Sequence, residues 1–105
     1  MTIAIDYDGV CSDLSIQTLA KKMIRERNEV WIVTMRSDNE FNNKILEPVL
    51  KRLNLTKYNV IYCDNKPKLE MLEMLNADIY IDNVNNEFAN ISRQTNIIPL
   101  LFSNS

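Results

Sequence analysis

The chain has 105 residues, enough for one domain around a single hydrophobic core and too few for a second domain of any size. Its 12 basic and 14 acidic residues give a net charge of −2, so no overall positive field would attract a polyanion such as a nucleic acid. The sequence contains no histidine, which excludes Ser-His-Asp and Cys-His catalysis and the usual histidine zinc sites. Any chemistry must therefore rest on carboxylates, lysine and a metal ion.

Membrane insertion and disulfide formation are not expected. No apolar segment approaches the roughly 20 residues that span a bilayer, and the first residues run directly into strand-like sequence instead of a signal peptide. Cys11 and Cys63 form neither a CxxC pair nor a metal-ligand spacing, so we expect both to be reduced and to serve as small packing residues. These features predict a cytoplasmic protein without a membrane partner.

Residues 3–10 combine an apolar run of strand length with two carboxylates, Asp6 and Asp8, and the only glycine, Gly9. Side chains alternate faces along a strand, so the two carboxylates should project to the same side. There they could share one cation or one phosphoryl group. The alternative interpretation of the same residues is an Asp-Gly hairpin turn.

The rest of the chain alternates between helical patterns and short apolar strands. Helical spacing of apolar residues follows N-cap residues at 12–13, 37–39, and 85–86, and Pro67 opens a further helix. Strands are predicted at 30–34, 60–63, 78–82 and 97–102. Pro48 predicts a kink or a restart of the second helix, and Pro99 places the last strand at an edge of the sheet. The pattern predicts an α/β fold, with helices on both faces of a parallel sheet.

Polar residues follow several of these strands. Asp6 and Asp8 end the first strand, Thr34 ends the second and Asp82 ends the fourth, while Lys66 precedes the helix that leads into the fourth. Sheets of this kind bind ligands at the carboxyl ends of their strands. All five residues are therefore expected at one edge of the sheet.

Four short motifs resemble those of the haloacid dehalogenase (HAD) superfamily of phosphoaspartyl hydrolases, in the same order. They are residues 6–10 (DYDGV), residues 31–34 (WIVT), Lys66, and residues 80–83 (YIDN). The resemblance implies a three-layer Rossmann-like fold with a five-stranded parallel sheet in the order 5-4-1-2-3. The chain departs from the family in two ways: Asn83 replaces a frequent second acid, and no flap or cap is found. We therefore expect residues 1–105 to form a single HAD-like hydrolase domain without a cap.

The resemblance and the chemistry of phosphate esters together predict a Mg²⁺-dependent phosphomonoester hydrolase that acts through an aspartyl-phosphate. Because a phosphate dianion repels an attacking carboxylate, the site needs cations. Asp6 is the expected nucleophile and a metal ligand. The side chain of Asp8 is the expected acid and base, and its backbone carbonyl is a further metal ligand. Asp82 completes the metal set, and Lys66 is the catalytic cation, with Lys68 as its alternative.

Three consecutive residues, Thr34, Met35 and Arg36, are predicted to bind the substrate. A small phosphate, such as a nucleotide, is favoured over a nucleic-acid end because binding to a long polyanion needs a basic surface. Two alternatives remain open. The chain could bind a metal or a partner without turnover, or it could be a phosphoacceptor signalling module in which Asp64 is phosphorylated.

Overall fold

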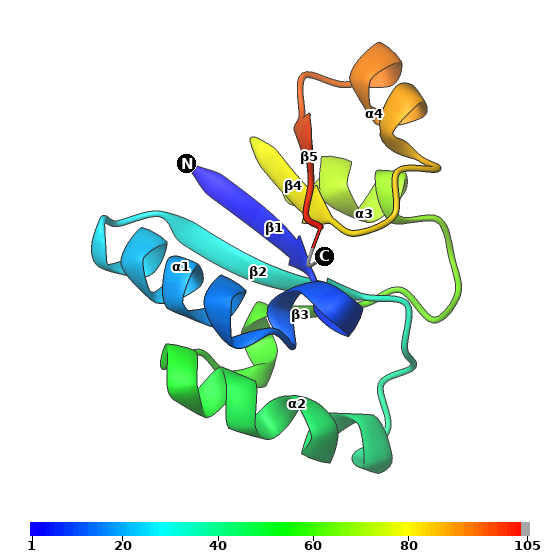
Figure 1. Ribbon diagram of the computed structural model, residues 1–105. Coiled ribbons are helices and arrows are strands. Elements are labelled where there is room, and N and C mark those ends of the chain that lie inside the picture. Colours follow the sequence, from blue (N-terminus) through cyan, green and yellow to red (C-terminus); the bar gives the residue numbers. More distant parts are fainter. Residues whose placement is uncertain (104–105) are drawn as a thin grey trace.

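The computed structural model describes residues 1–103, and within them five parallel strands form one sheet in the order β3-β2-β1-β4-β5. The strands are β1 (Thr2–Asp6), β2 (Glu29–Thr34), β3 (Val60–Tyr62), β4 (Ile79–Asp82) and β5 (Ile98–Leu101). The helices are α1 (Leu14–Arg25), α2 (Glu40–Leu53), α3 (Lys68–Met74) and α4 (Phe88–Gln94), with a short 3₁₀ turn, η2 (Lys57–Asn59), before β3. Figure 1 shows α1 and α2 on one face of the sheet and α3 and α4 on the other. The predicted three-layer Rossmann-like fold and its strand order are confirmed.

The central strand β1 supplies side chains to two separate hydrophobic cores. Ile3 and Ile5 pack into the core beneath α1 and α2, whereas Ala4 packs into the core beneath α3 and α4. This arrangement follows from the alternation of side chains along a strand, and it explains why the strand is almost continuously apolar. The residues that end β1 therefore emerge between the two helical layers.

The helix N-termini lie close to their predicted positions. The side chain of Asp13 accepts a hydrogen bond from the backbone N–H of Ser15 at 2.9 Å before α1, and that of Asn39 accepts one from Asn42 at 2.8 Å before α2. Each cap satisfies a backbone donor that the first turn of a helix leaves free.

The structure refines two predictions about helices. Of the two alternatives at Pro48, the restart is excluded, because α2 is one element in which Leu46, Val49 and Leu50 are buried against the core, and the kink stays a prediction. This packing holds the helix together through the exposed proline. The N-cap of the fourth helix is Glu87, one to two residues later than the predicted 85–86.

The chain leaves β1 through an irregular helical turn, η1 (Tyr7–Cys11), which leads directly into α1. Gly9 in this turn has a φ of 76°, and a Cβ atom added to it would lie 2.4 Å from Nδ2 of Asn83. The backbone conformation therefore favours glycine at this position, and any other residue would also displace the side chain of Asn83. The hairpin alternative is excluded, since the next strand, β2, runs parallel to β1.

Both cysteines are free and buried, as predicted, and burial raises the pKa of the Cys11 thiol to about 12. None of the helices in residues 1–103 combines the length and the apolar character that crossing a bilayer needs. The cytoplasmic location and the single-domain organisation stay predictions.

Replacing Gly9 with alanine should lower the free energy of unfolding by about 1–2 kcal/mol, because the backbone of the alanine must adopt a left-handed conformation. The contact with Asn83 should add to this loss. Urea unfolding of Gly9→Ala, Asn83→Ala and the double variant forms a cycle that separates the two effects. An unchanged stability of Gly9→Ala would contradict the conformation of η1.

Candidate functional site

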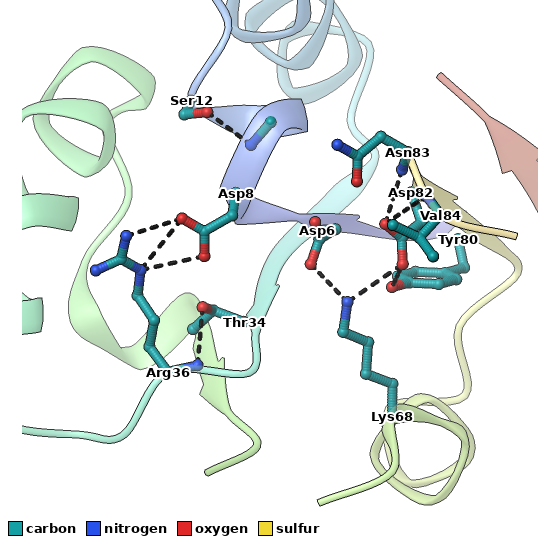
Figure 2. Close-up of polar contacts among 11 residues, drawn as sticks. Asp6, Asp8, Ser12, Thr34, Arg36, Lys68, Tyr80, Asp82, Asn83 and Val84 are labelled. Atoms are coloured by element: carbon teal, nitrogen blue, oxygen red, sulfur yellow. Dashed lines mark hydrogen bonds and ion pairs between the residues drawn. The ribbon is translucent and has the colours of Figure 1, made fainter. Parts of the chain in front are cut away.

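A buried lysine joins two strand ends at the carboxyl edge of the sheet. Nζ of Lys68 lies 2.6 Å from Oδ1 of Asp6 and 3.2 Å from Oδ2 of Asp82, and all three side chains are buried. Figure 2 shows the ammonium group between the two carboxylates. Residues from β1, α3 and β4 thus meet at one point.

The local sequence explains this meeting. Asp6 lies two residues after Ala4 on β1, and Asp82 lies two residues after Tyr80 on β4, so both carboxylates project toward the layer that holds α3 and α4. Lys68 is the first residue of α3, which packs on this face. Pro67, directly before it, suits the start of a helix because proline has no backbone N–H to leave unsatisfied.

The two carboxylates differ in how fully they are bonded. Asp82 accepts hydrogen bonds on Oδ1 from the backbone N–H groups of Asn83 and Val84, at 2.7 and 3.2 Å, and on Oδ2 from Lys68 and the hydroxyl of Tyr80. Asp6 accepts one hydrogen bond, from Lys68 to Oδ1, within the described part of the chain. Oδ2 of Asp6 is therefore the carboxylate oxygen that remains available to a ligand.

Burial and charge set the protonation of this group of residues. Burial raises the pKa of Asp6 from 3.8 to about 6, against the lowering effect of Lys68. Burial lowers the pKa of Lys68, but the bonds to Asp6 and Asp82 outweigh it and leave the pKa above the usual 10.5. The pKa of Tyr80 is raised by burial and by its bond to Asp82, so its hydroxyl remains a hydrogen-bond donor at neutral pH.

Asp8 lines the same hollow as Asp6 but does not share its cation. Because β1 ends at Asp6, Asp8 belongs to η1, and its carboxylate faces Arg36, with Nη2 2.8 Å from Oδ1 and Nε 3.1 Å from Oδ2. The guanidinium also donates to Asn42 at 2.9 Å and lies over the ring of Tyr7. Figure 2 shows Asp6 and Asp8 directed to different cations.

Lys66, the predicted cation, is exposed in the loop between β3 and α3. Lys68, the alternative, occupies the buried position instead. No local sequence signal decides between the two lysines, because the choice depends on where α3 begins relative to β1 and β4. Tyr80, which sequence reasoning missed, could have been found because it shares a strand face with Asp82.

A hollow of about 420 Å³ opens at this edge of the sheet. It is lined by Asp6, Asp8, Met35, Lys68, Asp82, Asn83, Val84, Asn86 and Glu87. Met35 thus lies where a substrate-binding residue was expected, whereas Thr34 and Arg36 do not line the hollow. Thr34 is fully buried, and its hydroxyl accepts the backbone N–H of Arg36 at 3.2 Å.

The hollow is strongly acidic, with four carboxylates and a single ammonium group among its lining side chains. Nevertheless, residues 1–103 contain no cluster of three or more acidic, cysteine or histidine side chains placed to hold a metal ion. The side chain of Asp8 pairs with Arg36, and both oxygens of Asp82 accept hydrogen bonds. The metal set of Asp6, Asp82 and the backbone carbonyl of Asp8 stays a prediction.

Comparison with known proteins bears on the fold. No family model and no curated protein sequence matches this chain. A solved structure that does match is a crystal structure of a universal stress protein in complex with cAMP, 15% identical in sequence. The match covers 100% of this chain and 98% of the other, with a TM-score of 0.61. The chain shares its fold with a universal stress protein.

This match overturns the assignment to the haloacid dehalogenase superfamily. The predicted phosphatase activity and its aspartyl-phosphate intermediate are corrected with it. That Asp6, Asp8 and Lys66 belong to a functional site stays a prediction. The four motifs are short, and polar residues at strand ends are a general feature of ligand-binding α/β sheets, so their order did not discriminate between families of this architecture.

Replacing Lys68 with methionine should destabilise the protein by about 3–5 kcal/mol, because two buried carboxylates would lose their shared cation. Lys66→Met, at the exposed position two residues earlier, should change the stability by no more than about 0.5 kcal/mol. Urea unfolding at pH 7 compares the two variants. Equal losses would show that Lys68 is not the buried cation.

The raised pKa of Asp6 predicts a pH dependence of stability. A carboxyl whose pKa rises from 3.8 to about 6 on folding binds more protons in the folded state. Its stabilising contribution to the free energy of unfolding is therefore fully present below pH 4 and is lost as the pH rises through 6. Asp6→Asn removes this titration. The free energy of unfolding of the variant, relative to that of the parent, should therefore rise by about 2 kcal/mol as the pH increases from 4 to 7. Unfolding is measured in metal-free buffer, with the exposed Glu70→Gln as control. A parallel pH profile of parent and Asp6→Asn would contradict the raised pKa.

Proposed function

We propose that the chain is a non-catalytic binding protein for a nucleotide, whose phosphate lies in the hollow at the carboxyl ends of β1 and β4. Parallel α/β sheets bind ligands at this edge, and a universal stress protein with the same fold has been crystallised in complex with cAMP. The volume of about 420 Å³ lies within the usual range of ligand pockets.

The observation that carries the proposal is the buried arrangement of Asp6, Lys68 and Asp82. A buried ammonium group flanked by carboxylates is costly to desolvate, and it is held here at the bottom of an open hollow. Oδ2 of Asp6 remains without a protein partner in residues 1–103. These features support a site for an ionic ligand.

We also propose that Mg²⁺ enters this site together with the nucleotide. Four lining carboxylates outnumber the ammonium group of Lys68 and the guanidinium of Arg36 that pairs with Asp8, so the site would repel a bare phosphate, and a divalent cation offsets this repulsion. Mg²⁺ is usually held by one or two carboxylates plus the phosphates of its ligand, not by an all-protein cage. Asp6 fits this role through Oδ2, whereas the oxygens of Asp8 and Asp82 are already bonded.

The loop between β4 and α4 would contact the rest of the ligand. Its amide side chains, Asn83 and Asn86, can both donate and accept hydrogen bonds, which suits the edge of a base. Glu87 can accept hydrogen bonds from ribose hydroxyls. Met35, directly after β2, offers an apolar wall. A small nucleotide therefore suits the hollow better than a phosphate without a nucleoside.

Calorimetric titration of ATP, AMP and cAMP, each with Mg²⁺ and with EDTA, tests the proposal. ATP should bind at least tenfold more tightly with Mg²⁺ than with EDTA, and the difference should be smaller for cAMP, whose phosphodiester carries a single charge. Mg²⁺ alone should bind weakly. Asp6→Asn should remove the Mg²⁺ effect, and Glu70→Gln should preserve it.

Two results would contradict the proposal. Failure of all three nucleotides to bind at millimolar concentration would rule out a nucleotide site. Release of inorganic phosphate from the bound nucleotide, measured by ion-exchange chromatography after prolonged incubation with Mg²⁺, would refute the non-catalytic part of the proposal.

A further inference from the structure

A second hollow, of about 620 Å³, lies between α1 and the C-terminal turn of α2, on the opposite face of the sheet from α3 and α4. Its charged lining consists of Lys21, Lys22, Arg25 and Arg52, and no acidic residue contributes to it. The hydroxyl residues Ser15 and Thr18 also line it. This basic hollow contrasts with the acidic hollow at the carboxyl edge.

Within residues 1–103, the four cations of the basic hollow have no carboxylate partner. Arg36, Lys44, Lys57 and Lys68 each lie within 4 Å of a carboxylate oxygen. None of the four cations that line the basic hollow has such a partner within residues 1–103, and all four are exposed. Gathered like charges repel one another and add nothing to folding stability, so an anionic partner would relieve the repulsion.

The overall charge of −2 conceals this basic face. Residues 14–57, which include α1 and α2, carry nine of the 12 basic residues but five of the 14 acidic ones. The rest of the chain carries three basic and nine acidic residues. The field over α1 and α2 is therefore positive at distances within a Debye length, about 8–10 Å at moderate salt.

We propose that the basic hollow binds the phosphate backbone of a nucleic acid, independently of base sequence. Two guanidinium groups, Arg25 and Arg52, suit bidentate contacts to phosphate, and the lysines and hydroxyls supply further donors. No aromatic side chain lines the hollow, so it offers no platform for stacking bases. A second copy of the chain fits less well, because its acidic surface is itself a hollow and two concave surfaces cannot fill each other. This proposal uses other residues than the nucleotide site and does not depend on it.

Fluorescence anisotropy with a labelled 20-base-pair DNA duplex at 25–200 mM NaCl tests the proposal. Contacts from three to four cations predict that log K falls with log[NaCl] with a slope of about −3 to −4. Arg25→Glu combined with Arg52→Glu should weaken binding at least tenfold at 50 mM NaCl and reduce the slope by about two. The control, Lys44→Glu with Arg93→Glu, changes the net charge equally at residues outside the hollow and should weaken binding less than threefold.

Thermal unfolding checks that both double variants are folded, and Lys21→Gln with Lys22→Gln replaces the first pair if it is not. No binding at 25 mM NaCl, or equal weakening by the control pair, would overturn the proposal. Sedimentation velocity without DNA provides a further check. Self-association that the Arg25→Glu, Arg52→Glu pair abolishes, in a protein that does not bind DNA, would assign the hollow to a second copy of the chain instead.

Discussion

The ion pairs of Lys68 with Asp6 and Asp82 are the interaction on which the carboxyl edge of the sheet depends. Desolvating one ammonium group and two carboxylates costs several kcal/mol for each ion, and only close pairing offsets that cost. The tyrosine hydroxyl and two backbone N–H groups complete the bonding of Asp82. The same contacts join the central strand, its neighbour β4 and helix α3, so the geometry of the site and the packing of the fold are fixed together.

Opposite charges lie in different parts of this small fold. Four carboxylates line the hollow at the carboxyl edge, whereas four cations line the hollow between α1 and α2. The sheet separates the α1 and α2 layer from the layer that supplies Lys68. A net charge near zero therefore says little about partners, because a ligand responds to the charges within a Debye length and not to their sum over the chain.

In this protein, a correct prediction of the architecture did not bring a correct prediction of the function. The sheet order β3-β2-β1-β4-β5 and the helices on both faces agree with the prediction, and a universal stress protein has the same fold. The short motifs at the strand ends nevertheless led to a hydrolase assignment that the structural comparison corrects. Polar residues gather at this edge in any fold of this type, so function depends on how individual side chains are bonded, as the different partners of Asp6 and Asp8 illustrate.

The sequence by itself determined the elements and their order along the chain, because apolar periodicity, caps such as Asp13 and Asn39, and the proline within the last strand act within a few residues. It also placed Asp6 and Asp82 at one edge, since strand ends in a parallel sheet share an edge. Only the tertiary structure decided that Lys68 and not Lys66 is buried, because that choice depends on where α3 begins relative to β1 and β4. It likewise turned Asp8 toward Arg36, since β1 ends at Asp6 and strand alternation no longer applies beyond that residue.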